Sequence, residues 1–397
     1  MIDFSPFAIG RLPQIRFGHG ALSQLPELLA PLGRRVLLLT GRRSFVATPQ
    51  ADMLLAALRS QGFLYRLASI EHEPSPQKID SLVASLREEG IDVVVGIGGG
   101  SVLDAAKAIA ALLPYGNSVL DHLEDVGKGL PYPGRPLPFI AVPTTAGTGS
   151  EATKNAVLSV QGEGGYKKSF RHDSMVAHTA LIDPSLLESC PSHLMAAQGM
   201  DAFTQLLESY VSLRSNPFTD ALAWSGMQAV AEGFMLALGQ AEGDVAHGQA
   251  CMAYAALLSG ICLAQTGLGS VHGLAQPLGS LFAVPHGIAC GSTLAEATAV
   301  NIQALQQRTP ESPALQKYAR VGCLLGKQQQ EVAHALRSLV EVLRDWCERL
   351  QIPHLGRYGV TVEDIPAIVM QSRNNSMKTN PVLLHDSELA RIIDARL

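Results

Sequence analysis

The chain has 397 residues, of which 47% are hydrophobic and 16% charged, and its net charge is −5. This composition is typical of a globular protein with large apolar cores, divided into two domains. The mild acidity and the lack of a basic stripe with interleaved aromatic residues argue against nucleic-acid binding. Neither a basic leader followed by an apolar stretch nor an apolar run of membrane-spanning length is evident, so we expect a cytoplasmic protein without membrane contact.

Apolar, β-branched segments alternate with helical patterns through the first part of the chain. The segments are RVLLLT (35–40), FLYRLASI (63–70), DVVVGIG (92–98), PFIAVP (138–143) and HTALID (178–183). This alternation predicts an α/β domain with a mostly parallel sheet. From Pro191 onward helical periodicity rich in alanine and leucine predicts an all-helical domain. A cleft between the two domains is the expected place for a functional site.

The segment 91–111, IDVVVGIGGGSVLDAAKAIAA, changes from a buried-strand pattern through glycines to an amphipathic helix pattern. Gly98, Gly99 and Gly100 would let backbone amides approach an anion closely, and we expect Ser101 to cap the helix. The positive end of the helix would face that anion, for which a nucleotide pyrophosphate is the usual ligand. Because the spacing departs from G-x-G-x-x-G, the turn alone is equally compatible with a structural role.

The loop PTTAGTGSEATKNAVLS (143–159) follows a predicted strand and is rich in short hydroxyl side chains. They could bond the phosphate, ribose or carboxamide of a nucleotide, or they could cap the turns of their own loop. These side chains are Thr144, Thr145, Thr148 and Ser150.

Two later segments carry candidate metal ligands. Asp201 and Gln205 lie four residues apart in the predicted helix 199–212, and His272 and His286 belong to segment 271–287. One carboxylate, one amide and two imidazoles would make a mixed oxygen and nitrogen site for a divalent first-row metal. Each histidine taken alone is more often a core or surface residue.

The six cysteines are scattered and include no C-x-x-C pair. We expect reduced thiols that pack as small hydrophobic residues, and a nucleophilic thiol among them is the less favoured alternative. They are Cys190, Cys251, Cys262, Cys290, Cys323 and Cys347.

Together the motifs resemble the iron-containing, or group III, alcohol dehydrogenases, in the superfamily of dehydroquinate synthase. The landmarks are GGGSVLDAAKAIA (98–110), PTTAGTGSEAT (143–153), ALIDP (180–184), GMDAFTQLLESYVS (199–212), GLGSVHGLAQPLG (267–279) and PHGIACG (285–291). The resemblance implies a Rossmann-like dinucleotide-binding α/β domain over 1–187 and a helical domain for metal and substrate over 188–397. It also implies NAD(P)-linked conversion between small alcohols and aldehydes by a homodimer or larger homo-oligomer.

The resemblance further implies which residues bind the cofactor. They are Gly41, Arg42, Gly98, Gly99, Gly100, Ser101, Asp104, Thr144, Thr145, Thr148, Ser150, Asn155 and Lys168. Gly41 stands where NAD-preferring members carry an aspartate for the ribose 2′-hydroxyl, and Arg42 and Arg43 follow it. We therefore expect NADP to be favoured over NAD, with two solvated loop arginines as the alternative. Lys167 and Lys168 match the place of a family lysine near the cofactor, or they are exposed residues of a hairpin.

The family's metal ligands, an Asp, a His four residues later and two His fourteen apart, match Asp201, Gln205, His272 and His286. The amide of Gln205 replaces an imidazole and is a weaker ligand for Fe²⁺ or Zn²⁺, so reduced metal affinity is expected. Gln276 also replaces a histidine that many members carry, and it cannot carry a proton at neutral pH. The expected catalytic residues are His272, His286, Gln276 and Lys168.

Three alternatives stay open at this point. Relatives of the maleylacetate reductase type work without metal, which would suit Gln205. A lyase of the dehydroquinate synthase type would use the same fold without net turnover of NAD(P)H. A protein that has lost catalysis and serves as a scaffold would explain both glutamines, Gln205 and Gln276.

Overall fold

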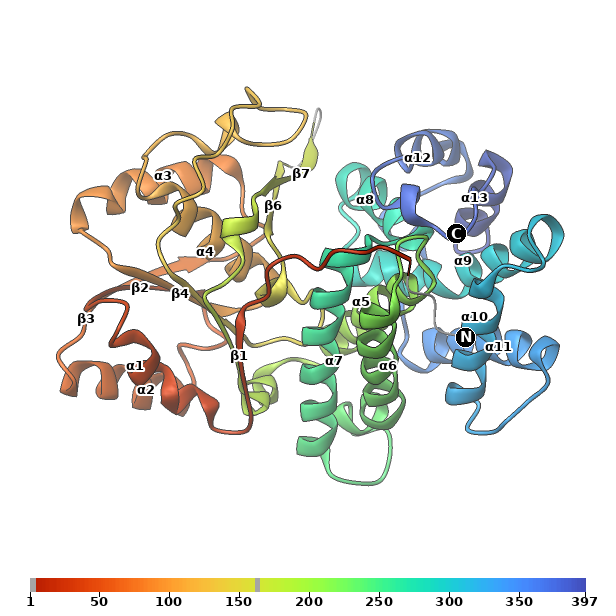
Figure 1. Ribbon diagram of the computed structural model, residues 1–397, viewed down its shortest axis with the longest axis horizontal. Coiled ribbons are helices and arrows are strands. Elements are labelled where there is room, and N and C mark those ends of the chain that lie inside the picture. The colour runs from red at the N-terminus through yellow and green to blue at the C-terminus, as the bar shows by residue number, and fades with distance from the viewer. Residues whose placement is uncertain (1–4, 161–164) are drawn as a thin grey trace. The chain divides into compact units, whose positions relative to one another are not determined.

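The computed structural model describes residues 5–160 and 165–397, which form two compact units (Figure 1). The α/β unit comprises Gly10–Pro191 together with Asp244–Ala253. The helical unit comprises residues 5–9, Ser192–Gly243 and Tyr254–Leu397. A parallel sheet in the first unit and a set of packed helices in the second confirm the predicted fold class.

Among the described residues, six strands of the α/β unit form one parallel sheet in the order β1-β8-β5-β4-β2-β3, and two more form an antiparallel hairpin. The strands are β1 (Gln14–Phe17), β2 (Arg35–Gly41), β3 (Leu64–Ile70), β4 (Val93–Gly98), β5 (Phe139–Pro143), the hairpin strands β6 (Asn155–Val160) and β7 (Tyr166–Arg171), and β8 (Thr179–Ile182). The helices are α1 (Leu25–Leu29), α2 (Pro49–Ser60), α3 (Pro76–Leu86) and α4 (Gly100–Leu112).

Helices cover both faces of the sheet, with α3 and α4 on one side and α1 and α2 on the other (Figure 1). Along β2, Val36 and Leu38 pack in the core beneath α1 and α2, whereas Leu37 and Leu39 pack in the core beneath α3 and α4. The four inner strands β2, β4, β5 and β8 are buried on both faces, so their sequences are mostly apolar instead of alternating. This is why they were predictable as apolar runs. The edge strand β3 was predicted as well, because its sequence LYRLASI is mostly apolar although much of it is exposed.

Two parts of the α/β unit were not predicted as strands. The edge strand β1 reads QIRF and is exposed along its whole length, so it carries no apolar run. The β6–β7 hairpin includes the pair Leu158 and Lys168, and its second strand reads YKKSFR. A strand that pairs outside the main sheet needs no continuous apolar sequence. For this reason the search for apolar runs did not predict the strands of this hairpin.

The chain order reverses between β2 and β4. From β2 the chain passes outward to β3, then crosses back to β4 on the other side of β2 and continues to β5. Thr40 near the end of β2 pairs with Ile97 near the end of β4, so the loops that follow these strands begin side by side. Ligands of open α/β sheets bind outside the carboxyl ends of the strands at such a reversal.

Helix α4 begins at Gly100, directly after the carboxyl end of β4. Gly99 takes the N-cap position with an extended backbone, and no side chain caps the helix. The expectation that Ser101 is the cap was therefore wrong, since Ser101 already lies in the first turn. No side chain of the described residues caps the amides at this end of α4, so these amides are available to an anion.

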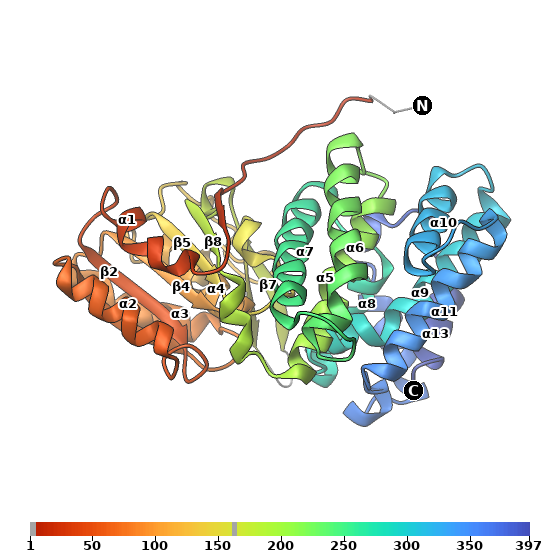
Figure 2. The same ribbon diagram turned by 90° about the horizontal axis from the view of Figure 1, so that it is seen from below.

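The helical unit is built around α5, whose residues are buried almost without interruption from Gly199 to Val211. Helix α5 packs against α6 and α9, and Figure 2 shows α5 and α6 running side by side. The helices are α5 (Ser192–Val211), α6 (Pro217–Ala237), α7 (Val245–Thr266, of which 254–266 belong to this unit), α8 (Ser270–Phe282), α9 (His286–Arg308), α10 (Pro313–Leu325), α11 (Val332–Arg349), α12 (Ile365–Gln371) and α13 (Asp386–Asp394).

A glycine explains how closely α5 and α6 approach each other. A Cβ at Gly199 would lie 2.2 Å from the ring of Phe234 on α6, which no side chain could tolerate without a shift. Asp201 follows two residues later, so this tight crossing also fixes the segment that carries it.

Helix α7 is long and apolar enough to cross a membrane by length and composition, so the expectation that no segment reaches that length was wrong. Most of its apolar window is buried inside the protein. A mostly buried apolar helix packs in the interior of a protein, so its length and composition are weak evidence for a membrane span.

Candidate metal and cofactor sites

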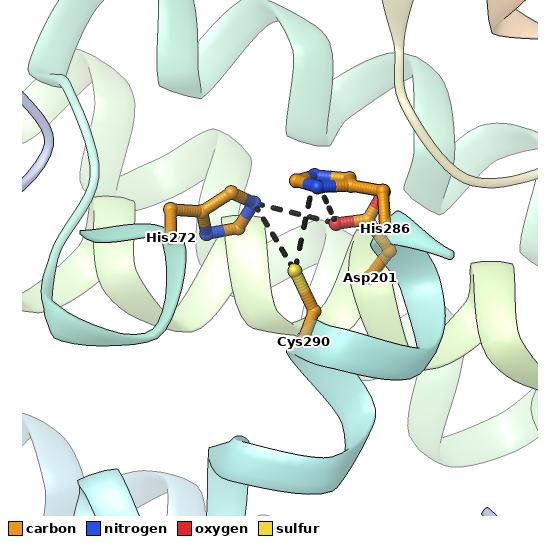
Figure 3. Close-up of side chains that lie close together, drawn as sticks. All are labelled: Asp201, His272, His286 and Cys290. Atoms are coloured by element: carbon orange, nitrogen blue, oxygen red, sulfur yellow. Dashed lines mark hydrogen bonds and ion pairs between the residues drawn. The ribbon is translucent and has the colours of Figure 1, made fainter. Parts of the chain in front are cut away.

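Four side chains from three helices of the helical unit converge on one point (Figure 3). They are Asp201 on α5, His272 on α8, and His286 and Cys290 on α9. The Oδ1 atom of Asp201 lies 3.3 Å from Nε2 of His272 and 3.5 Å from Nε2 of His286. The Sγ atom of Cys290 lies 3.7 Å and 3.8 Å from the same two nitrogens. We call these four residues the α5–α8–α9 cluster.

Helix geometry places each member of the cluster. His286 and Cys290 are four residues apart on α9, so both side chains lie on the same face of that helix. Asp201 lies in the buried stretch of α5 that packs against α9, with only 2% of its side chain exposed. His272 lies in the first turn of α8, which also packs against α9.

Glu208 fixes the orientation of His272. Its Oε2 atom accepts a 2.7 Å hydrogen bond from Nδ1 of His272, and its Oε1 atom accepts a 2.7 Å bond from the backbone amide of Val271. Because Nδ1 donates to this carboxylate, Nε2 faces the cluster. Glu208 was not found from the sequence, although it lies seven residues after Asp201 and therefore on the same face of α5.

The electrostatics of the cluster reflect its burial. Burial alone would raise the pKa of Asp201, but the imidazoles of His286 and His272 lower it to about 2. Burial would lower the pKa of His272, yet Cys290, Asp201 and Glu208 together raise it well above its ordinary value. Burial also raises the pKa of the Cys290 thiol to about 12.

The cluster fits a divalent cation. Oδ1 of Asp201 is buried and, within the described parts of the chain, receives no hydrogen bond of good geometry. In a tetrahedral zinc site, ligand bonds of about 2.0–2.3 Å place nitrogen and oxygen about 3.3 Å apart and sulfur and nitrogen about 3.6 Å apart. The separations of 3.3 and 3.5 Å and of 3.7 and 3.8 Å lie close to these values.

The two glutamines identified from the sequence lie near the cluster. Gln205 is one turn after Asp201 on α5 and is buried, and its Oε1 atom accepts a 2.7 Å hydrogen bond from the hydroxyl of Ser259. Gln276 lies one turn after His272 on α8 and is half-buried.

In the α/β unit, the hydroxyl loop folds back onto the glycine turn. A Cβ at Gly100 would lie 2.8 Å from the hydroxyl of Thr148, and one at Gly99 would lie 3.3 Å from Thr145. The amide of Thr144 donates to the carbonyl of Gly98. The structure therefore brings together two segments that the sequence separates by more than forty residues.

A buried charge cluster joins α4 to this loop. Nζ of Lys107, 1% exposed, donates to the hydroxyls of Ser150 and Thr153 and to the carbonyls of Ser150 and Asn155. Asp104 accepts hydrogen bonds from the Ser150 hydroxyl and from a backbone amide of β6. Of the sequence-predicted cofactor residues, Asp104, Ser150 and Asn155 thus meet each other here.

Glu151 belongs to the same buried region and is 3% exposed. Burial raises the pKa of Glu151 to about 7, and the nearby ammonium of Lys107 offsets only part of that rise. Lys107 was not identified from the sequence, where it reads as one more polar residue of an amphipathic helix.

The charged residues predicted near the cofactor, Arg42, Lys167 and Lys168, lie in exposed or half-buried ion pairs. Gly41 ends β2, and Arg42 after it pairs with Glu71 at 3.0 Å on the surface. Lys168 on β7 pairs with Asp125 at 2.8 Å, and its neighbour Lys167 pairs with Glu73 at 2.6 Å.

Both halves of the chain match one known family. Residues 13–184 match the family described as iron-containing alcohol dehydrogenase, and residues 195–397 match the C-terminal part of the Fe-containing alcohol dehydrogenase family. Long-chain-alcohol dehydrogenase 1 of Geobacillus thermodenitrificans is 35% identical over 69% of this chain and 68% of its own. Alcohol dehydrogenase 4 of Saccharomyces cerevisiae is 29% identical over 95% of each chain.

Solved structures agree with these sequence matches. A 1,3-propanediol oxidoreductase superposes with a TM-score of 0.88 at 29% identity, covering 99% of this chain and all of the other. The sulfoacetaldehyde reductase of Bifidobacterium kashiwanohense, solved in complex with NAD+, superposes with a TM-score of 0.84 at 27% identity over 99% of each chain. This chain is accordingly an alcohol oxidoreductase that belongs to the iron-containing alcohol dehydrogenase family.

Proposed function

We propose that the chain interconverts a small alcohol and its aldehyde with a nicotinamide cofactor and a divalent metal, Fe²⁺ or Zn²⁺. The observation that carries the proposal is the buried Oδ1 atom of Asp201, which faces two imidazole nitrogens and receives no hydrogen bond of good geometry from the described residues. Asp201, His272 and His286 would hold the metal. When bound, the metal supplies Lewis-acid polarisation of the substrate oxygen.

The residues around the metal have distinct tasks in this proposal. Glu208 keeps Nε2 of His272 directed toward the cluster through its 2.7 Å bond to Nδ1. Gln276 can hydrogen-bond a substrate oxygen but cannot accept its proton at neutral pH, so it would position the substrate. The proton of the alcohol must then leave through water or a cofactor hydroxyl.

We infer that the glycine turn binds the pyrophosphate of NAD(P) and that the cofactor supplies or accepts the hydride. The open amide end of α4, with Gly98, Gly99 and Gly100, lies at the reversal of strand order where dinucleotides bind. The hydroxyl loop against this turn offers Thr145 and Thr148 as further donors. Lys168 would reach the cofactor only by giving up its bond to Asp125.

The direct test measures metal and turnover on the same preparation. Gently purified protein should contain close to one iron or zinc per chain by inductively coupled plasma mass spectrometry. It should oxidise NADPH with a small aldehyde, and chelation should abolish this activity while readdition of the metal restores it. Undiminished turnover without metal would instead assign the chain to the metal-free reductases, with His272 and His286 acting directly on the substrate.

We propose that NADP(H) is preferred, because Gly41 leaves room for a 2′-phosphate and two exposed arginines follow it. Arg42 would exchange its surface bond to Glu71 for a bond to the phosphate. Replacing Arg42 and Arg43 by alanine should lower kcat/KM for NADPH about 10- to 100-fold, as expected for losing charge-assisted hydrogen bonds. The value for NADH should change less than about threefold.

The comparison of the two cofactors checks this prediction. Arg59→Ala is the matched control, because Arg59 is an exposed arginine on α2 that bonds Tyr65. It should leave both kcat/KM values unchanged. Equal or higher efficiency with NADH in the unmodified protein would contradict the preference.

A cytoplasmic location and self-association complete the proposal. None of the six cysteines forms a disulfide, which suits a reducing compartment. The strand β1 lies at an edge of the parallel sheet and exposes the apolar side chains of Ile15 and Phe17, and such an edge can pair with a second copy of the chain.

A further inference from the structure

Cys290 occupies the position that a fourth metal ligand needs. Its Sγ atom lies 3.7 Å from Nε2 of His272 and 3.8 Å from Nε2 of His286, and the residue is completely buried. Figure 3 shows the sulfur directed at the same point as the Asp201 carboxylate and the two imidazoles. A single thiol would be weak evidence, but the buried Asp201 oxygen that lacks a hydrogen-bond partner faces this point as well.

The alternative fourth ligand, Gln205, is engaged elsewhere. Its Oε1 atom, the only atom of the amide that could bind a metal, accepts a 2.7 Å hydrogen bond from Ser259. An amide is also a neutral and weak ligand, whereas a thiolate is charged and binds zinc strongly.

We propose that Cys290 is the fourth protein ligand of the metal in this chain, in place of Gln205, and that the resulting Asp–His–His–Cys set prefers Zn²⁺ to Fe²⁺. This inference rests on the proposed metal-dependent function. As the sulfur–metal bond forms, the S–H bond breaks and its proton passes to solvent, so the ligand is a thiolate. The softer sulfur donor selects zinc over iron in an otherwise oxygen and nitrogen site.

Cobalt(II) reports the ligand directly, because zinc is spectroscopically silent and cobalt replaces it in tetrahedral sites. The full-length protein, stripped of metal and loaded with one equivalent of Co²⁺, should show the intense near-ultraviolet charge-transfer band of a cobalt–thiolate bond. Zinc-edge X-ray absorption of the zinc-loaded protein should show one sulfur at about 2.3 Å with oxygen and nitrogen neighbours at about 2.0 Å. Both readings use the unmodified chain and do not depend on how a variant folds.

Variants assign the band to one cysteine. Cys290→Ser should lose the band and bind Co²⁺ at least tenfold more weakly. The control Cys262→Ser changes a buried cysteine on α7 whose thiol faces the carbonyl of Thr219. This variant should keep both the charge-transfer band and the Co²⁺ affinity of the unmodified protein. Gln205→Ala should also keep the band, with Co²⁺ affinity changed less than threefold.

Several results would overturn the proposal: no charge-transfer band or no Co²⁺ uptake by the unmodified protein, a band that survives Cys290→Ser, or a loss of affinity in Gln205→Ala that Cys290→Ser does not share. These outcomes are independent of turnover. A cobalt–thiolate band in a protein that does not oxidise or reduce NAD(P) would support the ligand assignment and refute the proposed reaction. Metal-dependent turnover without the band would support the proposed reaction and refute the ligand assignment.

Discussion

Replacing Asp201 by alanine is expected to lower kcat/KM for aldehyde reduction by at least about 10³-fold. The reason is that the metal which Asp201 helps to hold lowers the activation free energy by several kcal/mol as a Lewis acid. Bound metal should fall from near one equivalent to a small fraction. The physical reason is that Asp201 is the one carboxylate of the α5–α8–α9 cluster and is almost fully buried. Metal analysis and steady-state kinetics on the same preparation measure both effects.

Two further variants separate metal loss from misfolding. Asp201→Asn keeps the shape and one oxygen but removes the charge, so it should retain the melting temperature and bind metal more weakly than the unmodified protein. His193→Ala removes an exposed histidine from the same helix and should alter neither metal content nor activity. Near-normal turnover of a metal-free Asp201→Ala protein would reject the role assigned to this carboxylate.

The parts of the fold that the sequence predicts are those with one dominant pattern. Strands such as β2 and β4 are buried on both faces, so their apolar runs have a single interpretation. The exposed edge strand β1 and the hairpin β6–β7 depend on pairing with distant backbone, which leaves little trace in local composition. Helix α7 is a different case, because its residues are apolar on most sides over a length that could span a membrane. This apolar stretch was not predicted from the sequence.

The candidate site divides in the same way. Asp201, His272 and His286 were named from their spacing within long motifs, and the structure brings these three together. Cys290 was predicted only as one of six packed thiols and Glu208 was not named, although both lie at helical spacing from a predicted ligand, four after His286 and seven after Asp201. A cysteine or glutamate near a histidine in sequence carries no signal by itself, because only helix packing decides which face meets the other ligands.

Lys107 shows why buried charges are hard to predict. In the sequence it interrupts an alanine-rich helix pattern and would be placed on a solvated face. The structure buries its ammonium among four oxygen acceptors that come from residues more than forty positions away. Its counter-charges, Asp104 and Glu151, are therefore part of what joins α4 to the hydroxyl loop.

Glu151→Gln is expected to stabilise the protein, by about 3 kcal/mol at pH 8. The pKa of Glu151 is about 7 in the folded protein against an ordinary value of 4.5. The folded state thus holds a proton that the unfolded state has lost, and stability falls as the pH rises through this interval. At 1.36 kcal/mol for each pH unit, the difference amounts to about 3 kcal/mol once both states are ionised.

The neutral amide mimics the protonated acid, so the gain should shrink to about 1 kcal/mol at pH 5 and vanish below the ordinary pKa of a glutamate. Urea unfolding of both proteins at pH 5 and pH 8 measures this dependence. Glu88→Gln, at an exposed position after α3, is the control and should change stability by less than about 0.5 kcal/mol at either pH. A stability difference that is the same at pH 5 and pH 8 would mean that folding does not raise the pKa of Glu151, and it would contradict the prediction.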